Sequence, residues 1–171
     1  MLVKLDEHIN IREAQLEDII AITAIYNQAI DLGYVTADTE HVTVKSREEN
    51  WKTITQIQHR PFWVALQNEK IVGFFYFRNF YDRPAYRITA EIGIYLDKNA
   101  RGDGLGFKIL NFCMAEAPKL GIENILALIF ASNKNSLILF EKAGFEKNGE
   151  FLKIAKAENG YNDLIMLQKK I

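Results

Sequence analysis

The chain has 171 residues, of which 49% are hydrophobic and 25% charged, and 21 Lys and Arg against 22 Asp and Glu give a formal net charge of −1. This composition is that of a globular protein and excludes disordered, collagen-like and low-complexity classes, while the balanced charge argues against a partner such as nucleic acid or anionic lipid. The length suits a single domain, which we expect to cover residues 1–171.

Helical spacing marks the first part of the chain. Apolar residues recur every three or four positions over Leu16–Leu32, and Gly33 supplies a stop signal, so we expect a helix there. Residues 46–59 have the pattern of a second, more polar helix. Ser46 is its expected N-cap, with Glu49 completing a capping box, and Pro61 ends it.

Strands dominate the middle of the chain. Phe62–Leu66 and Ile71–Phe80 are apolar, aromatic-rich runs on either side of the polar turn 67–70, which is the pattern of a β-hairpin. Tyr86–Leu96 is a third expected strand. A glycine-rich loop and a helical pattern extending to Leu120 follow it.

The last third of the chain contains both strand-like and helix-like sequence patterns. Asn124–Phe130 is an apolar run suited to a buried strand, and Ser136–Ala143 is a short helix stopped by Gly144. Residues 145–154 and 161–169 read as two closing strands. With no internal repeat or linker, this order predicts an α/β (α+β) domain with a mixed, mostly antiparallel sheet and flanking helices.

The cysteine content and the lengths of the apolar runs indicate where in the cell the protein is found. The single cysteine, Cys113, cannot form an intramolecular disulfide, and nothing near it has the spacing of metal ligands. The chain begins without a charged-then-apolar leader. Its strongest apolar runs, Ile71–Phe77 and Ile125–Ala131, are far shorter than the roughly 18 residues of a bilayer span. We therefore expect a cytoplasmic protein with no metal site, no membrane contact and no nucleic-acid partner.

The loop between the third strand and the next helix carries glycine at alternate positions, Gly102, Gly104 and Gly106, preceded by Arg101. Glycines let backbone N–H groups approach a ligand, the helix N-terminus adds positive potential, and Arg101 adds a cation with a fork geometry suited to phosphate oxygens. These features favour a pyrophosphate ligand. A flexible turn without a ligand is the alternative.

Spacing decides which nucleotide would fit this loop. A Rossmann fingerprint needs glycine at the sixth position counted from Gly102, where this chain has Phe107. A Walker loop needs a magnesium-binding hydroxyl where this chain has Ile109. The spacing therefore disfavours an NAD-dependent oxidoreductase and an ATPase.

Glu91 is a carboxylate inside the apolar strand segment Ile88–Ile94. Burial there would make it more basic and suit it to general base catalysis. A Glu91 on the solvent face of the strand is the alternative.

Several segments of the sequence resemble those of a known family. The segment Ile94–Gly106 resembles the acetyl-CoA signature of the GNAT superfamily of N-acetyltransferases, and Asn133–Phe145 is similar to the later motif of that superfamily. Residues 24–27, 35–40 and 83–91 resemble the branch that acetylates phosphinothricin and methionine sulfoximine. The resemblance covers about residues 9–168.

The resemblance implies a GNAT-like sheet in which two neighbouring strands splay apart to form a cleft for acetyl-CoA, the co-substrate. Main-chain groups of the strand would bind the pantetheine and the glycine loop the pyrophosphate. The implied cofactor contacts are Ile94, Tyr95, Leu96, Arg101, Gly102, Asp103, Gly104, Leu105, Gly106, Phe107, Asn133 and Ser136.

It also implies an enzyme, a homodimer, that moves an acetyl group to the α-amine of a small amino acid or analogue with Glu91 as general base. The implied substrate contacts are Tyr81, Asp82, Arg83 and Pro84, and Arg83 could pair with a substrate carboxylate. Phe140 stands where the family often has a proton donor, so either another group protonates the leaving thiolate or none is required, and we name no general acid. A non-catalytic acyl-CoA sensor is the alternative function.

Overall fold

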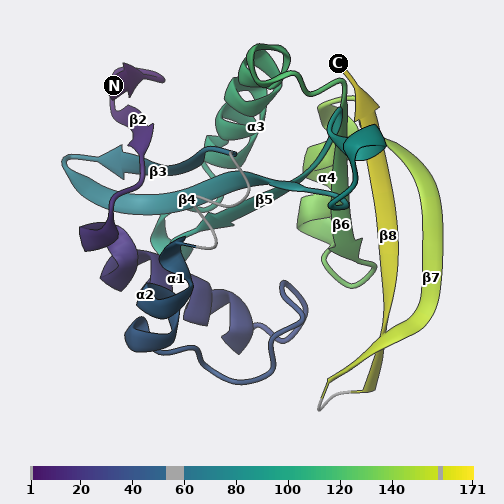
Figure 1. Ribbon diagram of the computed structural model, residues 1–171. Coiled ribbons are helices and arrows are strands. Elements are labelled where there is room, and N and C mark those ends of the chain that lie inside the picture. Colours follow the sequence, from purple (N-terminus) through teal and green to yellow (C-terminus); the bar gives the residue numbers. More distant parts are fainter. Residues whose placement is uncertain (1, 53–59, 158–159) are drawn as a thin grey trace.

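The computed structural model describes residues 2–52, 60–157 and 160–171, and its strands form one sheet in the order β1-β2-β3-β4-β5-β6-β8-β7 (Figure 1). The helices and strands are β1 (Leu2–Lys4), β2 (Ile9–Glu13), α1 (Ile19–Asp31), α2 (Val44–Lys52), β3 (Phe62–Gln67), β4 (Lys70–Asn79), β5 (Thr89–Leu96), α3 (Leu105–Glu116), β6 (Asn124–Phe130), α4 (Lys134–Lys142), β7 (Glu146–Ala157) and β8 (Gly160–Lys170). Neighbouring strands are antiparallel except β5 and β6, which are parallel. The predicted mixed, mostly antiparallel sheet is confirmed.

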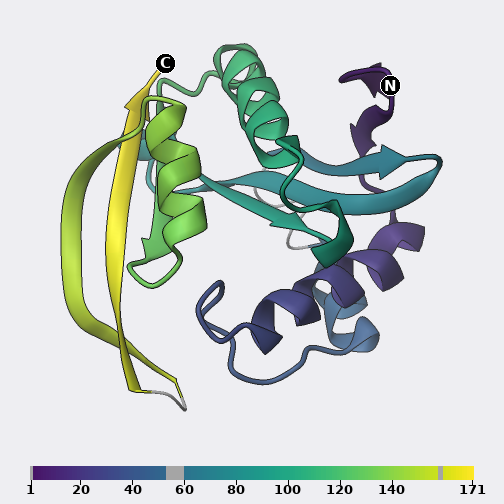
Figure 2. The ribbon, with the colours of Figure 1, turned by 180° about the vertical axis from the view of Figure 1, so that it is seen from behind.

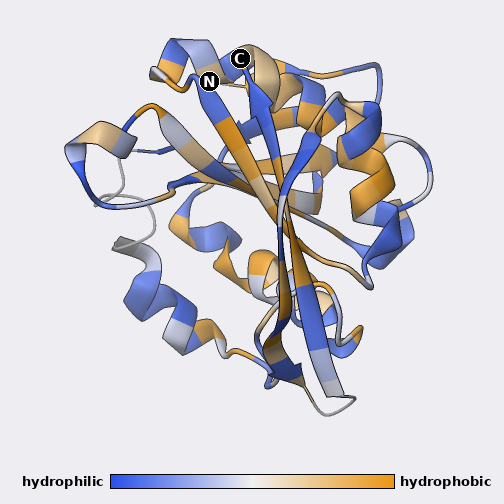
Figure 3. Cartoon of the chain, turned by 90° about the vertical axis from the view of Figure 1, so that its right-hand side faces the viewer, coloured by the Kyte–Doolittle hydropathy of each residue, from blue (hydrophilic) through white to orange (hydrophobic). Residues whose placement is uncertain are grey.

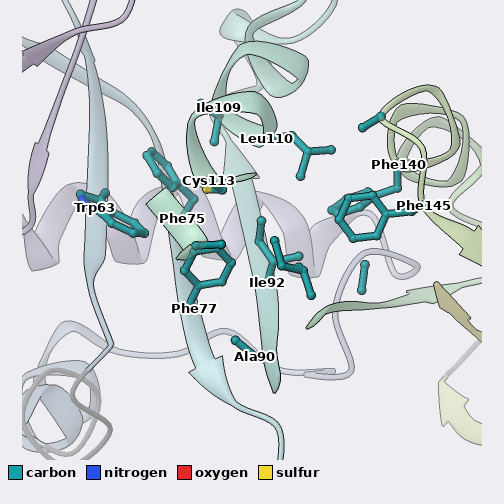
Figure 4. Packing of buried hydrophobic residues seen from close by; sticks show 14 of the residues in the cluster. Trp63, Phe75, Phe77, Ala90, Ile92, Ile109, Leu110, Cys113, Phe140 and Phe145 are labelled. Atoms are coloured by element: carbon teal, nitrogen blue, oxygen red, sulfur yellow. The ribbon is translucent and has the colours of Figure 1, made fainter. Parts of the chain in front are cut away.

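Helices cover both faces of the sheet. Helices α1 and α2 lie on one side of β3, β4 and β5, and α3 lies on the other side (Figures 1 and 2). Because successive side chains of a strand point to opposite faces, β4 sends Phe74 toward α1 and sends Phe75 and Phe77 toward α3. Figure 4 shows the core on the α3 side, where these two rings pack near Cys113.

The predicted helices form, with shifted starts. Helix α2 begins at Val44, and the Ser46 N–H donates to Thr43 Oγ1 over 3.1 Å, so the prediction of Ser46 as N-cap is wrong. Thr43 precedes a polar turn just as Ser46 does, and the sequence offered no way to choose between two good caps. The expected end of this helix lies outside the described residues. Most of α2 is hydrophilic (Figure 3), as its pattern indicated.

The helices of the carboxyl-terminal half also form, with bounds that differ by a few residues from the predicted ones. Helix α3 ends at Glu116, and Pro118 lies in the short 3-10 helix that follows, so the predicted end at Leu120 includes this extra turn. Helix α4 begins at Lys134, two residues before the predicted start, because Asn133 caps it. Among the described residues, no helix is both long and apolar enough to cross a bilayer.

The strands differ from prediction at β1 and β2, at the start of β5 and at the end of β7, which runs to Ala157 rather than to residue 154. Strands β1 and β2 were not predicted, because β2 has only five residues and buries just Ile9 and Ile11. Strand β5 begins at Thr89 rather than at Tyr86, because Pro84–Tyr86 forms a 3-10 helix with Pro84 in its first turn. The hairpin of β3 and β4 and the strand β6 lie where the sequence placed them.

Candidate functional site

Strands β5 and β6 separate in the middle of the sheet. They pair only between Thr89–Glu91 and Asn124–Leu126, after which β5 continues beside β4 and β6 continues beside β8 (Figure 2). Over Ile92–Leu96, the edge of β5 that faces β6 has no strand partner among the described residues. Main-chain N–H and C=O groups on such an edge need other partners, and an extended ligand with amide groups can supply them.

The glycine loop follows this open edge after the short 3-10 helix Lys98–Ala100. Gly102 has a φ of +99° and Gly104 a φ of +77°, values that L side chains rarely adopt, and nothing lies within 4 Å of a Cβ built at either position. Gly104 is the N-cap of α3, and no side chain of the described residues caps the helix. The N–H groups of Leu105 and Gly106, the first two of α3, can therefore donate to an anion, whereas the Phe107 N–H donates to the Gly104 carbonyl oxygen.

Two residues of this loop have structural contacts that the sequence did not indicate. The Arg101 guanidinium donates from Nε and Nη2 to the Leu96 carbonyl oxygen over 3.0 and 2.9 Å, which ties the loop to the end of β5. A Cβ on Gly106 would lie 3.2 Å from Leu139 Cδ2. Gly106 thus lets the first turn of α3 approach α4 closely.

The later predicted residues cap and pack helix α4. Asn133 is buried, and its Oδ1 accepts a hydrogen bond from the Ser136 N–H over 3.3 Å. Phe140 is also buried, and its ring meets that of Phe145 edge-on at a centroid distance of 4.9 Å. Position 140 is therefore part of the core and supplies no proton donor.

Glu91 lies at the point where β5 and β6 separate. It faces Arg78 of β4 in the strand register, and Arg78 Nη2 lies 2.6 Å from Glu91 Oε1. The Glu91 side chain is 15% exposed. Glu91 is therefore mostly covered, and its apolar sequence neighbours Ala90 and Ile92 point to the opposite face of the sheet, toward α3.

Two tyrosines share this face with Glu91. The hydroxyls of Tyr76 and Tyr95 are hydrogen-bonded to each other, and burial raises the pKa of both. Gly93 leaves room for Tyr76, since a Cβ at this position would lie 2.6 Å from Tyr76 Cζ. Both hydroxyls stay protonated at neutral pH and act as hydrogen-bond donors or acceptors there.

A pocket of about 310 Å³ opens on the same side of the sheet. Its wall combines aromatic rings from β3 and β4 with two guanidinium groups and one carboxylate. The lining residues are Tyr26, Asp38, Val42, Ser46, Arg47, Asn50, Phe62, Phe74, Tyr76, Phe77 and Arg78. A second pocket of about 310 Å³ shares Asp38 and is bounded by the end of α1 and by β7 and β8. Both have the size of small ligand sites.

Tyr26 of α1 organises the polar wall of the first pocket. Its hydroxyl donates to Asp38 Oδ2 over 2.7 Å and lies 2.7 Å from Thr36 Oγ1. Arg47 Cζ lies 4.0 Å from the centre of the Tyr26 ring, a cation–π contact. Burial raises the pKa of Tyr26 to about 12, so this hydroxyl keeps its proton and holds Asp38.

The predicted substrate loop lies elsewhere. Tyr81, Asp82, Arg83 and Pro84 are exposed in the turn after β4, where Arg83 Cζ is 6.0 Å from the Tyr81 ring centre, and none of them lines either pocket. The structure instead brings Arg78 to Glu91. The sequence signal that could have identified Arg78 is that this charged residue lies within an aromatic-rich strand.

Arg47 carries no comparable signal. It belongs to a polar helix in which Lys45, Glu48 and Glu49 are exposed, and only the packing of α2 places it in the pocket. Among the described residues, no group of three or more His, Cys, Asp or Glu side chains is arranged to hold a metal ion.

Comparison with known proteins gives consistent matches over almost the whole chain. A family model described as an acetyltransferase (GNAT) domain matches residues 11–166. YwnH of Bacillus subtilis strain 168, which carries the provisional name of a phosphinothricin acetyltransferase, is 42% identical over 162 residues, 94% of this chain and 98% of that protein. An L-methionine sulfoximine/L-methionine sulfone acetyltransferase of Pseudomonas aeruginosa is 27% identical over 161 residues, 93% of this chain and 92% of its own.

The fold has solved counterparts. The crystal structure of a GNAT superfamily phosphinothricin acetyltransferase from Sinorhizobium meliloti, in complex with AcCoA, is similar with a TM-score of 0.89 at 27% identity. The match covers 96% of this chain and 89% of that chain.

Proposed function

The chain belongs to the GNAT family of acetyltransferases, and from this premise we propose that it moves the acetyl group of acetyl-CoA to the α-amine of a small amino acid or analogue, of the phosphinothricin or methionine sulfoximine type. The observation that carries the proposal is the position of Glu91. This carboxylate lies where β5 and β6 separate, and it contacts Arg78 in the wall of a small pocket.

The open edge of β5 and the glycine loop fit the cofactor. Ile94, Tyr95 and Leu96 would offer main-chain groups to the pantetheine amides, and the loop Gly102–Phe107 would hold the pyrophosphate at the start of α3. We further assign Arg101, Asn133 and Ser136 to the cofactor site, as the resemblance implies. The open space beside Gly102 and Gly104 supports the placement of the pyrophosphate on this loop.

Acetyl-CoA supplies a thioester carbonyl. In the proposed reaction Glu91 accepts a proton from the acceptor amine, directly or through a water, so that the nitrogen lone pair can attack this carbonyl. The new C–N bond forms, the C–S bond breaks, and the sulfur leaves with the electron pair of that bond. Because a thiol has a pKa of about 8.5, the thiolate is a tolerable leaving group and needs no protein acid.

The surroundings of Cys113 favour direct transfer over an acetyl-enzyme intermediate. Cys113 is the single cysteine of the chain, and it is fully buried among the residues that pack α3 against the sheet. Burial raises the pKa of its thiol well above the usual value. A protonated thiol that neither substrate can reach is not a nucleophile.

Glu91→Gln tests the base. We expect turnover, followed as thiol release, to fall by roughly 10²–10⁴, while the acetyl-CoA dissociation constant measured by calorimetry stays unchanged. Glu146→Gln, at an exposed glutamate of β7, is the matched control. Near-normal turnover of a folded Glu91→Gln protein would exclude Glu91 as the base.

Cofactor choice is tested by thermal stability. Acetyl-CoA at about a hundred times its dissociation constant should stabilise the fold by roughly 2.7 kcal/mol and raise the melting temperature by about 5–10 °C. Stabilisation by NAD instead would contradict the proposal. Binding of acetyl-CoA without thiol release in a panel of small amines would favour the acyl-CoA sensor.

We also propose a single domain that acts as a cytoplasmic homodimer, as expected from the sequence and its resemblance. Light scattering coupled to size-exclusion chromatography measures the mass directly. A mass of 19.7 kDa, that of one chain, would contradict the dimer.

A further inference from the structure

Arg78 connects the proposed base to the pocket. Its Nη2 donates to Glu91 Oε1 over 2.6 Å, and its side chain is 49% exposed and lines the pocket, whereas the Glu91 side chain is only 15% exposed. The strand register fixes this arrangement, because Arg78 and Glu91 are directly opposite each other on β4 and β5. A molecule in the pocket can therefore reach Arg78 while Glu91 stays largely covered.

This ion pair opposes the chemistry proposed for Glu91. A carboxylate that accepts a charge-assisted hydrogen bond from a guanidinium is stabilised in its charged form. It loses that stabilisation on taking a proton from an amine. When Arg78 binds another anion, Glu91 Oε1 loses its guanidinium partner and is free to contact an amine or a water.

The acid group of an acceptor bound in the pocket can be the anion that binds Arg78. Arg47 is a second guanidinium in the same wall, and its Cζ lies 4.0 Å from the centre of the Tyr26 ring. Guanidinium groups bind carboxylates and phosphinates with paired N–H donors. An acceptor that carries only amines would instead meet two like charges.

The rest of the wall suits the body of such an acceptor. Phe62 and Phe74 stack at a centroid distance of 5.6 Å, and Tyr76 stacks on Phe62 at 5.2 Å, which gives the pocket an apolar side. Asp38, held by Tyr26, adds a carboxylate for a positive group. The volume of about 310 Å³ fits one small molecule.

We propose that the acid group of the acceptor binds Arg78, with Arg47 as its second partner, and takes the place of Glu91 on the guanidinium, so that only acid-bearing amines release the base. This inference rests on the proposed function. It makes Arg78 the residue that selects amino acids over simple amines, in place of Arg83.

The test compares methionine sulfoximine with its analogue lacking the carboxylate, in wild type and Arg78→Met. The wild type should prefer the acid-bearing amine. In Arg78→Met, kcat/KM for methionine sulfoximine should fall roughly 10- to 150-fold. The kcat for the acid-free amine should stay the same or rise, because Glu91 is then free. A role confined to folding would lower both.

Two further variants keep the test decisive. Arg78→Lys retains the charge and should restore part of the acid preference even if Arg78→Met is poorly folded. Lys45→Met removes an exposed cation of α2 that does not line the pocket, and it should leave the preference unchanged. Loss of the preference in Arg83→Ala, with its retention in Arg78→Met, would overturn the proposal in favour of the loop after β4.

Calorimetric binding of methionine sulfoximine separates this inference from the proposed function. Binding that depends on Arg78, without thiol release from any amine, would support the acid site and overturn the transferase activity. Thiol release with an acid preference that survives in both Arg78 variants would keep the activity and overturn the role of Arg78.

Discussion

Gly93→Ala is a small change with a consequence that the structure makes calculable. Gly93 is opposite Tyr76 in the register of β4 and β5, and a Cβ at this position would lie 2.6 Å from Tyr76 Cζ and 2.8 Å from its hydroxyl oxygen. Non-bonded carbon atoms prefer separations of about 3.5–4.0 Å. The Tyr76 ring must therefore move by roughly 1 Å.

The ring has little freedom to move. It stacks on Phe62 at a centroid distance of 5.2 Å and is hydrogen-bonded to Tyr95 through its hydroxyl. Overpacking of this kind costs about 1–3 kcal/mol, and each kcal/mol lowers the melting temperature of a domain of this size by about 2–4 °C. We expect calorimetry to show a decrease of about 2–12 °C for Gly93→Ala.

Function should change in a selective way. Tyr76 lines the acceptor pocket, so its displacement should raise the KM for the acceptor and leave the acetyl-CoA dissociation constant unchanged. Gly149→Ala is the control, because its Cβ would lie 3.1 Å from the flexible end of Met166 and should cost less than about 1 kcal/mol. A Gly93→Ala protein with the melting temperature and acceptor KM of the wild type would refute this reasoning.

Three further outcomes can be measured. Asn133→Ala removes the N-cap of α4 and should lower the free energy of unfolding in urea by about 0.5–2 kcal/mol, whereas no change would show that the cap adds nothing. Gly104→Val forces a side chain into a φ of +77° and should weaken acetyl-CoA binding while sparing the acceptor KM; equal losses in both would argue against a cofactor loop. Burial raises the pKa of Tyr26 to about 12 and raises those of Tyr76 and Tyr95, so the folded state holds these protons longer than the unfolded chain. This part of the stability is complete below pH 10 and is lost as the pH rises toward 12; a titration of phenolate absorbance in which all seven tyrosines of the folded protein ionise with a midpoint near pH 10 would disprove it.

Local patterns carried much of the fold. The run Asn124–Phe130 became β6 with the predicted bounds, and the runs around the turn 67–70 became the hairpin of β3 and β4. Gly102 and Gly104 lie between a strand and a helix with positive φ, and Gly106 lies in the first turn of that helix. Such signals are readable because periodicity, turn residues and helix stops act over a few neighbouring positions.

Other features had weak or ambiguous local signals. Strand β2 is held in place by pairing with β3, since its five residues alone are too few to show a clear alternation. The cap of α2 is Thr43 rather than the predicted Ser46, because the helix begins at Val44. Asn133 caps α4, although the sequence pattern predicted that this helix begins two residues after its observed start.

The sequence by itself determined a glycine loop at the start of a helix and a carboxylate inside an apolar strand, because both are written in consecutive residues. The tertiary structure alone decided what surrounds that carboxylate. Arg78 meets Glu91 through the register of two strands, and Arg47 joins Arg78 through the docking of α2. Register and docking are set by contacts between distant parts of the chain, so a charge that lies thirteen positions away in the sequence can be the nearest one in space.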